Sequence, residues 1–205
     1  MQTTKETAQI AELTKKEMLD LLFLKARTHH GWLDRPVPDE ILQQAYDLSR
    51  MGPTSANDNP LRLVFIKSTE AKNRLKPCLS PGNVDQTMSA PVTAIIAYDM
   101  EFYEHLSRLF PHTDAKSWYV GKPDAIFITA FRNGTLQGAY YMLACRALGL
   151  DIGPMSGFDN DAVDTEFLAN TPYKSNWLCN IGYGDPSKLH PRGPRFDFNE
   201  IAKII

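Results

Sequence analysis

The stretch that decides the fold runs from Asp124 to Phe158 and reads DAIFITAFRNGTLQGAYYMLACRALGLDIGPMSGF. Pro123 and Asp124 mark a helix start, because proline suits the first turn and aspartate there satisfies free backbone N–H groups. Gly149 marks the helix end, as glycine does just past a last turn. Between these signals, apolar and small residues recur at alternating spacings of four and three, which places on one face Phe127, Phe131, Gly134, Gly138, Tyr141, Cys145 and Leu148.

The opposite face of this helix is hardly polar. Its residues are Ile126, Leu136, Ala139, Tyr140, Leu143 and Ala147. A helix that is apolar nearly all round is buried, either in a large core or between subunits. Gly134 and Gly138 each cost about 1 kcal/mol relative to alanine in a helix interior. The sequence therefore predicts that another backbone approaches the helix closely at these two glycines.

The segment after the helix, Gly153-Pro154-Met155-Ser156-Gly157-Phe158, is predicted to be an uncharged loop. Two glycines and small side chains let such a segment lay its backbone N–H groups against a flat ligand without steric hindrance. Glycine-proline loops are also common as plain connections behind a core helix. The ligand-binding interpretation therefore needs support from elsewhere in the chain.

Length, charge and cysteine usage narrow the class of protein. A chain of 205 residues is expected to form a single domain over residues 1–205. The formal charge of −2 argues against nucleic acid as a partner, and the longest apolar runs are too short for a membrane span. Charges interrupt the first twenty positions, so no signal peptide is expected. Cys78, Cys145 and Cys179 lack metal-binding or disulfide spacing, which indicates no structural metal and a reducing, cytoplasmic compartment.

Strands are few and helices are mixed among them, which indicates an α+β fold. The predicted strands cover residues 61–66, 91–98 and 176–181. The second of them is apolar on both faces and is expected at the centre of a sheet. Further helices are predicted around residues 13–26, 38–48, 70–78, 101–110, 161–168 and 199–205.

Three arginines at rigid turns are candidates for binding a phosphate. Arg27 follows a predicted helix and precedes Thr28 and His29, whereas Arg192 and Arg195 flank a Gly-Pro pair near the end of the chain. A planar guanidinium donates bidentate, charge-assisted hydrogen bonds that suit phosphate oxygens. The alternative, for each arginine taken singly, is that it covers a carboxylate or a helix end.

A polar loop adds a third candidate feature. Pro53-Thr54-Ser55-Ala56-Asn57 either hydrogen-bonds the heteroatoms of a ring or forms a capped turn between a helix and a strand. The chain lacks the Gly-x-Gly-x-x-Gly fingerprint, the Walker loop, His-Glu-x-x-His and Gly-x-Ser-x-Gly. A phosphate ligand without a dinucleotide fingerprint, together with a glycine-proline platform, points to a planar cofactor with a phosphate tail, such as FMN.

Taken together in this order and spacing, these motifs resemble the nitroreductase family of FMN-dependent oxidoreductases over almost the whole chain. Three stretches are further similar to the family members that reduce malonic semialdehyde in pyrimidine degradation. These stretches are residues 26–32 (ARTHHGW), 52–57 (GPTSAN) and 153–159 (GPMSGFD), with support from residues 101–104, 109–112 and 181–185.

The resemblance implies a central, mostly antiparallel sheet flanked by helices, with the long helix at the interface of a homodimer. It implies that FMN is bound by Arg27, Thr28, His29, Pro53, Thr54, Ser55, Asn57, Asn83, Gln86, Pro154, Met155, Ser156, Gly157, Arg192 and Arg195. The basic residues among them would hold the phosphate, Asn83 and Gln86 the pyrimidine edge, and residues 154–157 one ring face. Residues 53–57 would reach the flavin of the partner subunit. Many relatives carry lysine where this chain has Gly31, and many carry lysine at Gln86.

The activity implied is NADH- or NADPH-dependent reduction of a small molecule, malonic semialdehyde, to 3-hydroxypropanoate. Hydride would pass through N5 of the flavin, near the backbone of Ser156 and Gly157, so no side chain is expected to act as a catalytic group. Two alternatives stay open: a broad nitro or quinone reductase, and an FMN-binding protein without turnover.

Overall fold

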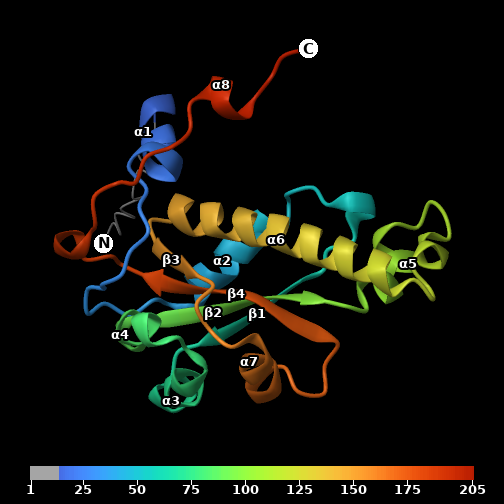
Figure 1. Ribbon diagram of the computed structural model, residues 1–205, viewed down its shortest axis with the longest axis horizontal. Coiled ribbons are helices and arrows are strands. Elements are labelled where there is room, and N and C mark those ends of the chain that lie inside the picture. The colour runs from blue at the N-terminus through green and yellow to red at the C-terminus, as the bar shows by residue number, and fades with distance from the viewer. Residues whose placement is uncertain (1–13) are drawn as a thin grey trace, which may run out of the picture.

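The computed structural model describes residues 14–205 and contains a four-stranded sheet in the order β1-β2-β4-β3 (Figure 1). Every neighbouring pair of strands is antiparallel, which confirms the predicted α+β class and antiparallel sheet. The strands are β1 (Leu61–Ile66), β2 (Val92–Asp99), β3 (Asp151–Met155) and β4 (Tyr173–Gly182).

Helices cover both faces of this sheet. The α-helices are α1 (Lys15–Leu19), α2 (Asp39–Ser49), α3 (Thr69–Leu75), α4 (Val84–Ser89), α5 (Leu106–Leu109), α6 (Pro123–Ala147), α7 (Asn160–Phe167) and α8 (Phe198–Ile201). A π-helical segment (Asp20–Leu24) continues α1, and the short 3-10 segments are Ser55–Asn57, Lys76–Cys78, Pro81–Asn83, Phe102–His105, Ala115–Trp118 and Pro186–Lys188. Figure 1 shows α2 and α6 on one face and α3, α4 and α7 on the other.

The helix predictions hold for α2, α3, α6 and α7, with shifts of a few residues at their ends. The helix predicted over 101–110 divides into a 3-10 segment and α5, and the last helix ends at Ile201 because Ala202 is already extended. Residue 13, where the first helix was expected to begin, lies outside the described residues. None of the helices within residues 14–205, α6 included, combines the length and the apolar character that a membrane crossing requires.

Strand β2 is buried along its whole length, as predicted for a central strand. Because successive side chains of a strand point to opposite faces, its residues divide between two cores. Ala94 and Ile96 pack in the core under α6, whereas Ile95 and Ala97 pack in the core that α3 and α7 cover. The sheet is therefore a rigid middle layer.

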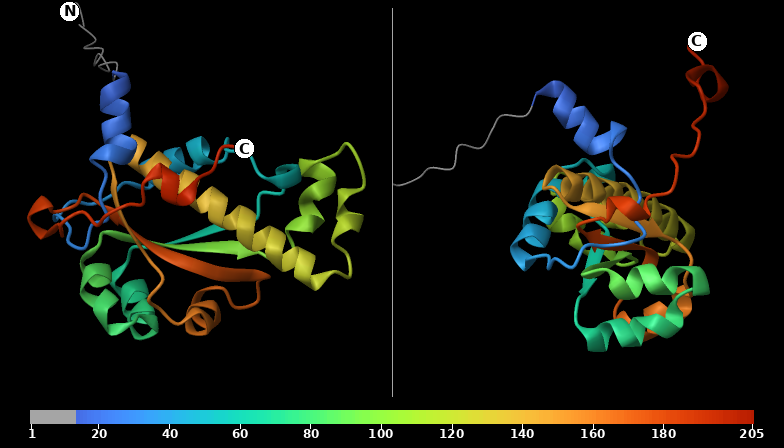
Figure 2. Two further views of the ribbon diagram at one scale, coloured as in Figure 1. Left: turned by 45° about the horizontal axis from the view of Figure 1, so that its top comes forward. Right: turned by 90° about the vertical axis from the view of Figure 1, so that its left-hand side faces the viewer.

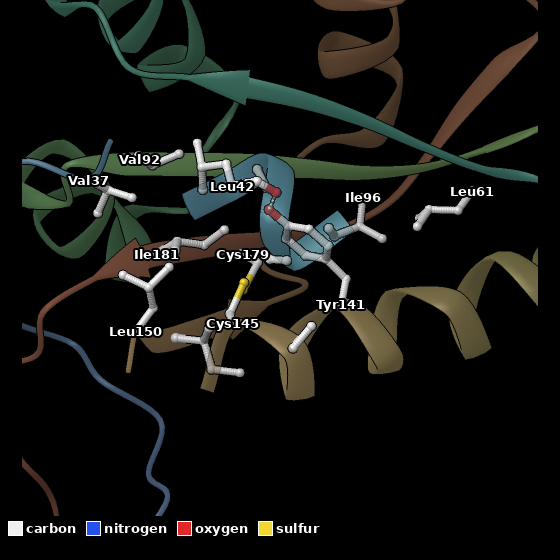
Figure 3. Close-up of a cluster of buried hydrophobic side chains, with 14 residues drawn as sticks. Val37, Leu42, Leu61, Val92, Ile96, Tyr141, Cys145, Leu150, Cys179 and Ile181 are labelled. Atoms are coloured by element: carbon white, nitrogen blue, oxygen red, sulfur yellow. Dashed lines mark hydrogen bonds between the residues drawn. The ribbon is translucent and has the colours of Figure 1, made fainter. Parts of the chain in front are cut away.

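The core beneath α6 joins the helix to the sheet and to α2. Figure 3 shows Tyr141 and Cys145 pointing from α6 toward Ile96 and Cys179 of the sheet. The Tyr141 hydroxyl donates a hydrogen bond to the carbonyl oxygen of Leu42, at 3.3 Å, so the one polar atom of this side chain is satisfied. This bond fixes α2 against α6.

Helix α6 begins at Pro123, and Gly149, with φ of +78°, follows its end, so both signals were interpreted correctly. The prediction for its two glycines was only partly right. A Cβ on Gly134 would lie 2.8 Å from Cβ of Tyr98, and one on Gly138 would lie 2.7 Å from Trp177. The glycines therefore let α6 approach its own sheet: a Cβ on Gly134 would also lie 3.7 Å from the backbone Cα of Tyr98, whereas the three nearest atoms at Gly138 belong to side chains.

The single chain does not bury α6 all round, so of the two predicted alternatives only burial between subunits would cover the whole helix. Phe127, Ile128 and Phe131 are 46%, 48% and 42% exposed, and Leu136 is 39% exposed. The sheet, α2 and the segment after α1 cover the helix only in part, and the rings of Phe127 and Phe131 stay half exposed although both contact Tyr98 of β2. An apolar surface of this kind is the helix face available for a partner.

Candidate functional site

A basic cavity lies between residues 23–30 and residues 190–195, and we call it the arginine cavity. Its volume is about 460 Å³. Figures 1 and 2 show α1 and the C-terminal segment on the same side of the molecule, above α6. The described lining consists of Phe23, Ala26, Arg27, Thr28, His30, Arg146, His190, Pro191, Arg192, Gly193 and Arg195. Four of these residues are arginines and none is acidic, so the cavity favours an anion.

Hydrogen bonds between the two chain segments build this cavity. Arg192 donates from Nη2 to the carbonyl oxygens of Leu24 and Ala26, at 2.8 and 2.9 Å. Arg27 donates in return to the carbonyl oxygen of His190. Because each guanidinium has five N–H donors, both arginines keep donors for a ligand after these bonds are made.

Arg146 enters the cavity from the last turn of α6. Its Nη1 donates to the carbonyl oxygen of Leu22 at 3.1 Å, which joins the helix to the segment after α1. Burial, with a smaller contribution from nearby Arg192, lowers the pKa of the Arg146 guanidinium. The cavity thus holds several positive charges at close quarters, an arrangement that a bound anion would relieve.

His29, predicted to hold the phosphate, lies outside this lining. Its side chain is buried against Gly184, with Nε2 3.3 Å from Oδ1 of Asp151. Successive side chains of extended backbone point to opposite sides, so His29 points inward while Thr28 and His30 face the cavity. Burial acts to raise the pKa of Asp151, but hydrogen bonds from His29 and the Gly184 backbone outweigh it and lower that pKa. In the structure, His29 therefore contacts Asp151 and does not line the cavity in which it was expected to bind the phosphate.

A strip of hydrogen-bonded amides leads away from the arginine cavity. His30 Nδ1 lies 2.6 Å from Oε1 of Gln86, and Nε2 of Gln86 donates to Oδ1 of Asn83 at 2.5 Å. Asn83 Nδ2 then donates to the carbonyl oxygen of Gly157 at 2.8 Å. The strip connects the arginine cavity with the glycine-proline segment, so two regions singled out separately in the sequence are continuous in space.

The glycine-proline segment itself is partly a strand. Asp151–Met155 forms β3, the edge strand beside β4, so the prediction of a loop was wrong for Gly153, Pro154 and Met155. Ser156 is exposed and Gly157 follows it. A Cβ on Gly157 would lie 2.5 Å from Nδ2 of Asn83, so the close contact with the amide strip requires glycine at this position.

The Pro53–Asn57 loop lies on α6, apart from the arginine cavity of the same chain. Tyr140 donates from its hydroxyl to the carbonyl oxygen of Pro53 at 3.1 Å, and the N–H of Ser55 donates to Oδ1 of Asn133 at 2.9 Å. Asn57 Nδ2 donates to the carbonyl oxygen of Leu109 at 2.8 Å. The structure therefore does not bring this loop together with the arginines within one chain.

Comparison with known proteins shows which family has this sequence pattern. The sequence pattern of the nitroreductase family matches residues 24–183. The chain belongs to the nitroreductase family. The matched region contains the amide strip, the glycine-proline segment and the loop of residues 53–57.

Relatives within the nitroreductase family cover nearly the whole chain. A candidate NADH dehydrogenase/NAD(P)H nitroreductase of Burkholderia lata is 61% identical over 186 residues, which are 91% of this chain and 95% of the relative. A relative of the same description from Polynucleobacter asymbioticus is 55% identical over 196 residues, 96% of this chain and 100% of its own. A nitroreductase-like protein of Exiguobacterium sibiricum, solved in complex with FMN, has a TM-score of 0.81 at 20% identity, covering 94% and 99% of the two chains. That likeness establishes the shared fold.

Two basic residues near the site were missed by sequence reasoning. Arg146 is the only charged residue between Arg132 and Asp151, and an isolated charge in an apolar helix was the signal for it. The position of Lys188 close to Gly31 is visible only in the three-dimensional structure. A Cβ on Gly31 would lie 2.2 Å from Cδ of Lys188, so the stem of Lys188 occupies the space that a side chain at position 31 would need. This member of the nitroreductase family thus places a lysine from another segment beside Gly31.

Proposed function

We propose that this protein is an FMN-dependent NAD(P)H oxidoreductase that reduces malonic semialdehyde to 3-hydroxypropanoate in pyrimidine degradation. One observation carries the cofactor assignment: a cavity with four arginines and no acid in its described lining is joined by the His30–Gln86–Asn83 strip to Gly157. FMN has the matching chemistry, with an anionic phosphate at one end and a flat, hydrogen-bonding ring at the other.

The residues present fit this group. Arg27, Arg192 and Arg195, with Thr28 beside them, would hold the phosphate through charge-assisted hydrogen bonds. The amides of Asn83 and Gln86 offer donors and acceptors to ring heteroatoms. Residues 154–157 would cover one ring face, because Gly157 is already in close contact with Asn83 and leaves no side chain in the way. His29 has no place in this arrangement.

Bound FMN would supply the redox chemistry, accepting a hydride from NADH or NADPH and giving it up to the aldehyde carbon. The chain's own contribution is to bind and orient. The amide strip fixes Gln86 relative to Gly157, and the exposed residue Ser156 would offer its backbone N–H to the ring.

The substrate assignment rests on the sequence stretches at residues 26–32, 52–57 and 153–159. The second candidate is a broad nitro or quinone reductase, favoured by the description of the Burkholderia and Polynucleobacter relatives as NADH dehydrogenase/NAD(P)H nitroreductases. Both candidates use the same cofactor site. They differ in the reactant that follows the nicotinamide.

We further propose that residues 1–205 form one domain that works as a homodimer with composite sites, in a cytoplasmic setting. The support is the separation of the Pro53–Asn57 loop from the arginine cavity, together with the exposed apolar face of α6. The C-terminal segment adds Phe196, Phe198 and Ile201, all largely exposed. A second copy would cover these surfaces and bring a Pro53–Asn57 loop to each cofactor.

Absorbance and steady-state kinetics test this function. The purified protein should be yellow, and NADH or NADPH should bleach the colour. Rates with malonic semialdehyde, a nitroarene and a quinone should then rank malonic semialdehyde first, with 3-hydroxypropanoate as the product. A bleachable flavin with faster turnover of the nitroarene or quinone would favour the second candidate, and colour without bleaching would leave only an FMN-binding protein.

A further inference from the structure

A second basic cavity lies between α5, the end of α2 and Gln137 of α6, and we call it the α5 cavity. Its volume is about 470 Å³. Its basic lining residues are Arg50 at the end of α2, Arg62 on β1, and His105 and Arg108 at α5. It shares no described lining residue with the arginine cavity. A volume of this size lies within the range of small-molecule sites.

The charges around the α5 cavity are only partly compensated. Arg62 pairs with the buried carboxylate of Asp99, and His105 Nε2 lies 3.8 Å from the same carboxylate. Arg50 Nε lies 3.3 Å from Oδ1 of Asp47, in a pair that water can screen because both side chains are about half exposed.

Arg108 is the least compensated of these cations. Within residues 14–205 it has neither an ion pair nor a side-chain hydrogen bond, and the described lining of the cavity includes no acidic side chain. Arg108 therefore keeps all five guanidinium donors available to a ligand.

The wall beside these arginines is rigid and polar. Asn57 lines the cavity and is tied to α5 through its bond to the carbonyl oxygen of Leu109. Gln137 of α6, also in the lining, donates to Oδ1 of Asn59 at 2.9 Å and accepts from the N–H of Leu61. These bonds hold the loop of residues 53–59 against the helix, so the cavity is built before a ligand arrives.

We propose that the α5 cavity is a subsite for the anionic group of the reactant, in which Arg108 is the principal ligand of carboxylate or phosphate oxygens. The proposal rests on the proposed function, because Asn57 belongs to the loop assigned there to the flavin of the partner subunit. Two reactants carry such a group: the oxo acid has a carboxylate, and the nicotinamide dinucleotide has phosphates. A guanidinium with all its donors available binds either group through paired, charge-assisted hydrogen bonds.

Binding of two small probes separates the sources. Malonate stands in for the carboxylate and pyrophosphate for the dinucleotide, and calorimetry measures the affinity of each. The proteins compared are the wild type, Arg108→Gln, Arg27→Ala, and the control Arg74→Gln, which removes the same charge from an exposed residue of α3 on the other face of the sheet. Arg108 is exposed, so its replacement should leave the fold intact.

We expect Arg108→Gln to weaken one probe by at least about tenfold while Arg74→Gln leaves both affinities unchanged. Loss of malonate identifies the oxo acid as the source, and loss of pyrophosphate identifies the dinucleotide. In turnover, kcat/KM for malonic semialdehyde should fall in the first case while that for uncharged propanal stays constant. Equal affinities in wild type and Arg108→Gln would overturn the proposal, as would binding lost only in Arg27→Ala. Arg108-dependent binding by a protein that does not reduce malonic semialdehyde would retain the subsite and reject the proposed function.

Discussion

Two buried ionisable side chains, Asp58 and Lys72, should make the stability of this fold depend on pH. Asp58 is fully buried next to the Pro53–Asn57 loop, and burial raises the pKa of its carboxyl to about 7. Between the lower pKa of the unfolded chain and about pH 7, the carboxyl of Asp58 therefore keeps its proton in the folded state but has lost it in the unfolded state. The resulting contribution to stability is complete at low pH and is lost as pH rises through about 7.

Asp58→Asn should therefore stabilise the protein by about 1–3 kcal/mol more at pH 8 than at pH 5, because the neutral amide has nearly the same shape as the protonated acid and does not ionise. Urea unfolding at the two pH values measures the difference. A stability change of the same size at both pH values would show that charge on Asp58 is not its cause.

Lys72 is the opposite case, a buried base. It is 4% exposed, and Nζ donates to the carbonyl oxygen of Thr87 at 2.8 Å and to Oγ1 of Thr93 at 2.5 Å. Burial lowers its pKa to about 7, below the value in the unfolded chain. Between those two values the unfolded state binds the extra proton, so this residue makes stability rise with pH, by at most about 1.4 kcal/mol per unit.

Lys72→Met should remove this dependence. The free energy of unfolding of the wild type should increase more between pH 7 and 9 than that of the variant, since the other titrating groups are common to both. Urea midpoints across this range provide the comparison. Parallel pH profiles for the two proteins would contradict the assigned role of Lys72.

Arg27 is the residue that most directly tests cofactor binding. Arg27→Ala removes a guanidinium from the lining of the arginine cavity and should lower FMN affinity roughly ten- to a hundredfold, from hydrogen bonds to a charged group of about 1.5–3 kcal/mol. Riboflavin, which lacks the phosphate, should bind equally to both proteins, and Arg74→Gln should behave as wild type. Fluorescence titration measures all of these affinities; an unaltered FMN affinity in Arg27→Ala would exclude Arg27 from the phosphate site.

At the scale of elements, sequence patterns were reliable where one local signal dominated. Pro123 and Gly149 bracketed α6, and the mostly apolar sequence of β2 on both faces identified the central strand. The signals failed for β3, because Gly153 and Pro154 are typical of turns. This strand lies at the sheet edge, where proline is tolerated. Its pairing with β4 depends on the tertiary structure and cannot be predicted from the spacing of apolar residues.

The candidate site shows the same limit. Arg27, Arg192 and Arg195 were predictable from charge at rigid turns, and the structure brings them together. Which side of the extended segment faces the cavity was not predictable from the sequence: His30 lines the cavity, whereas His29, the predicted phosphate ligand, does not. Lys188 was missed because its position beside Gly31 depends on contacts between segments more than 150 residues apart.

The segment after β3 is the element whose role can be tested by a single change. Gly157→Val places a branched side chain where a Cβ alone would lie 2.5 Å from Nδ2 of Asn83, so it should displace the amide strip. The phosphate contacts lie elsewhere, so FMN occupancy should fall only modestly. Bleaching by NAD(P)H should slow by at least about tenfold, or ~1.4 kcal/mol of barrier, as stopped-flow absorbance would record. Wild-type bleaching in a folded, flavin-loaded variant would remove this segment from the mechanism.

For the whole molecule, the exposed side of α6 and the separation of the Pro53–Asn57 loop from the arginine cavity predict an obligate homodimer. Phe127 and Phe131 stack with ring centroids 5.7 Å apart, and both rings contact Tyr98 of β2, so the half-exposed apolar surface that they form is preorganised. Covering such a surface in a stable dimer requires an interface of more than about 2,000 Å². Sedimentation of the wild type at low micromolar concentration should then reveal only dimer.

Phe131→Asp tests the dimer and the composite site together. A carboxylate buried in an apolar interface without a partner costs several kcal/mol, so the variant should sediment largely as monomer. It should also lose NAD(P)H-bleachable flavin, because each arginine cavity would lack the loop supplied by the second copy. Leu33→Asp, at a similarly exposed apolar residue outside α6, is the matched control and should stay dimeric and yellow. A monomeric wild type that binds FMN and is bleached would refute the composite site, since every group needed for cofactor chemistry would then reside in one chain.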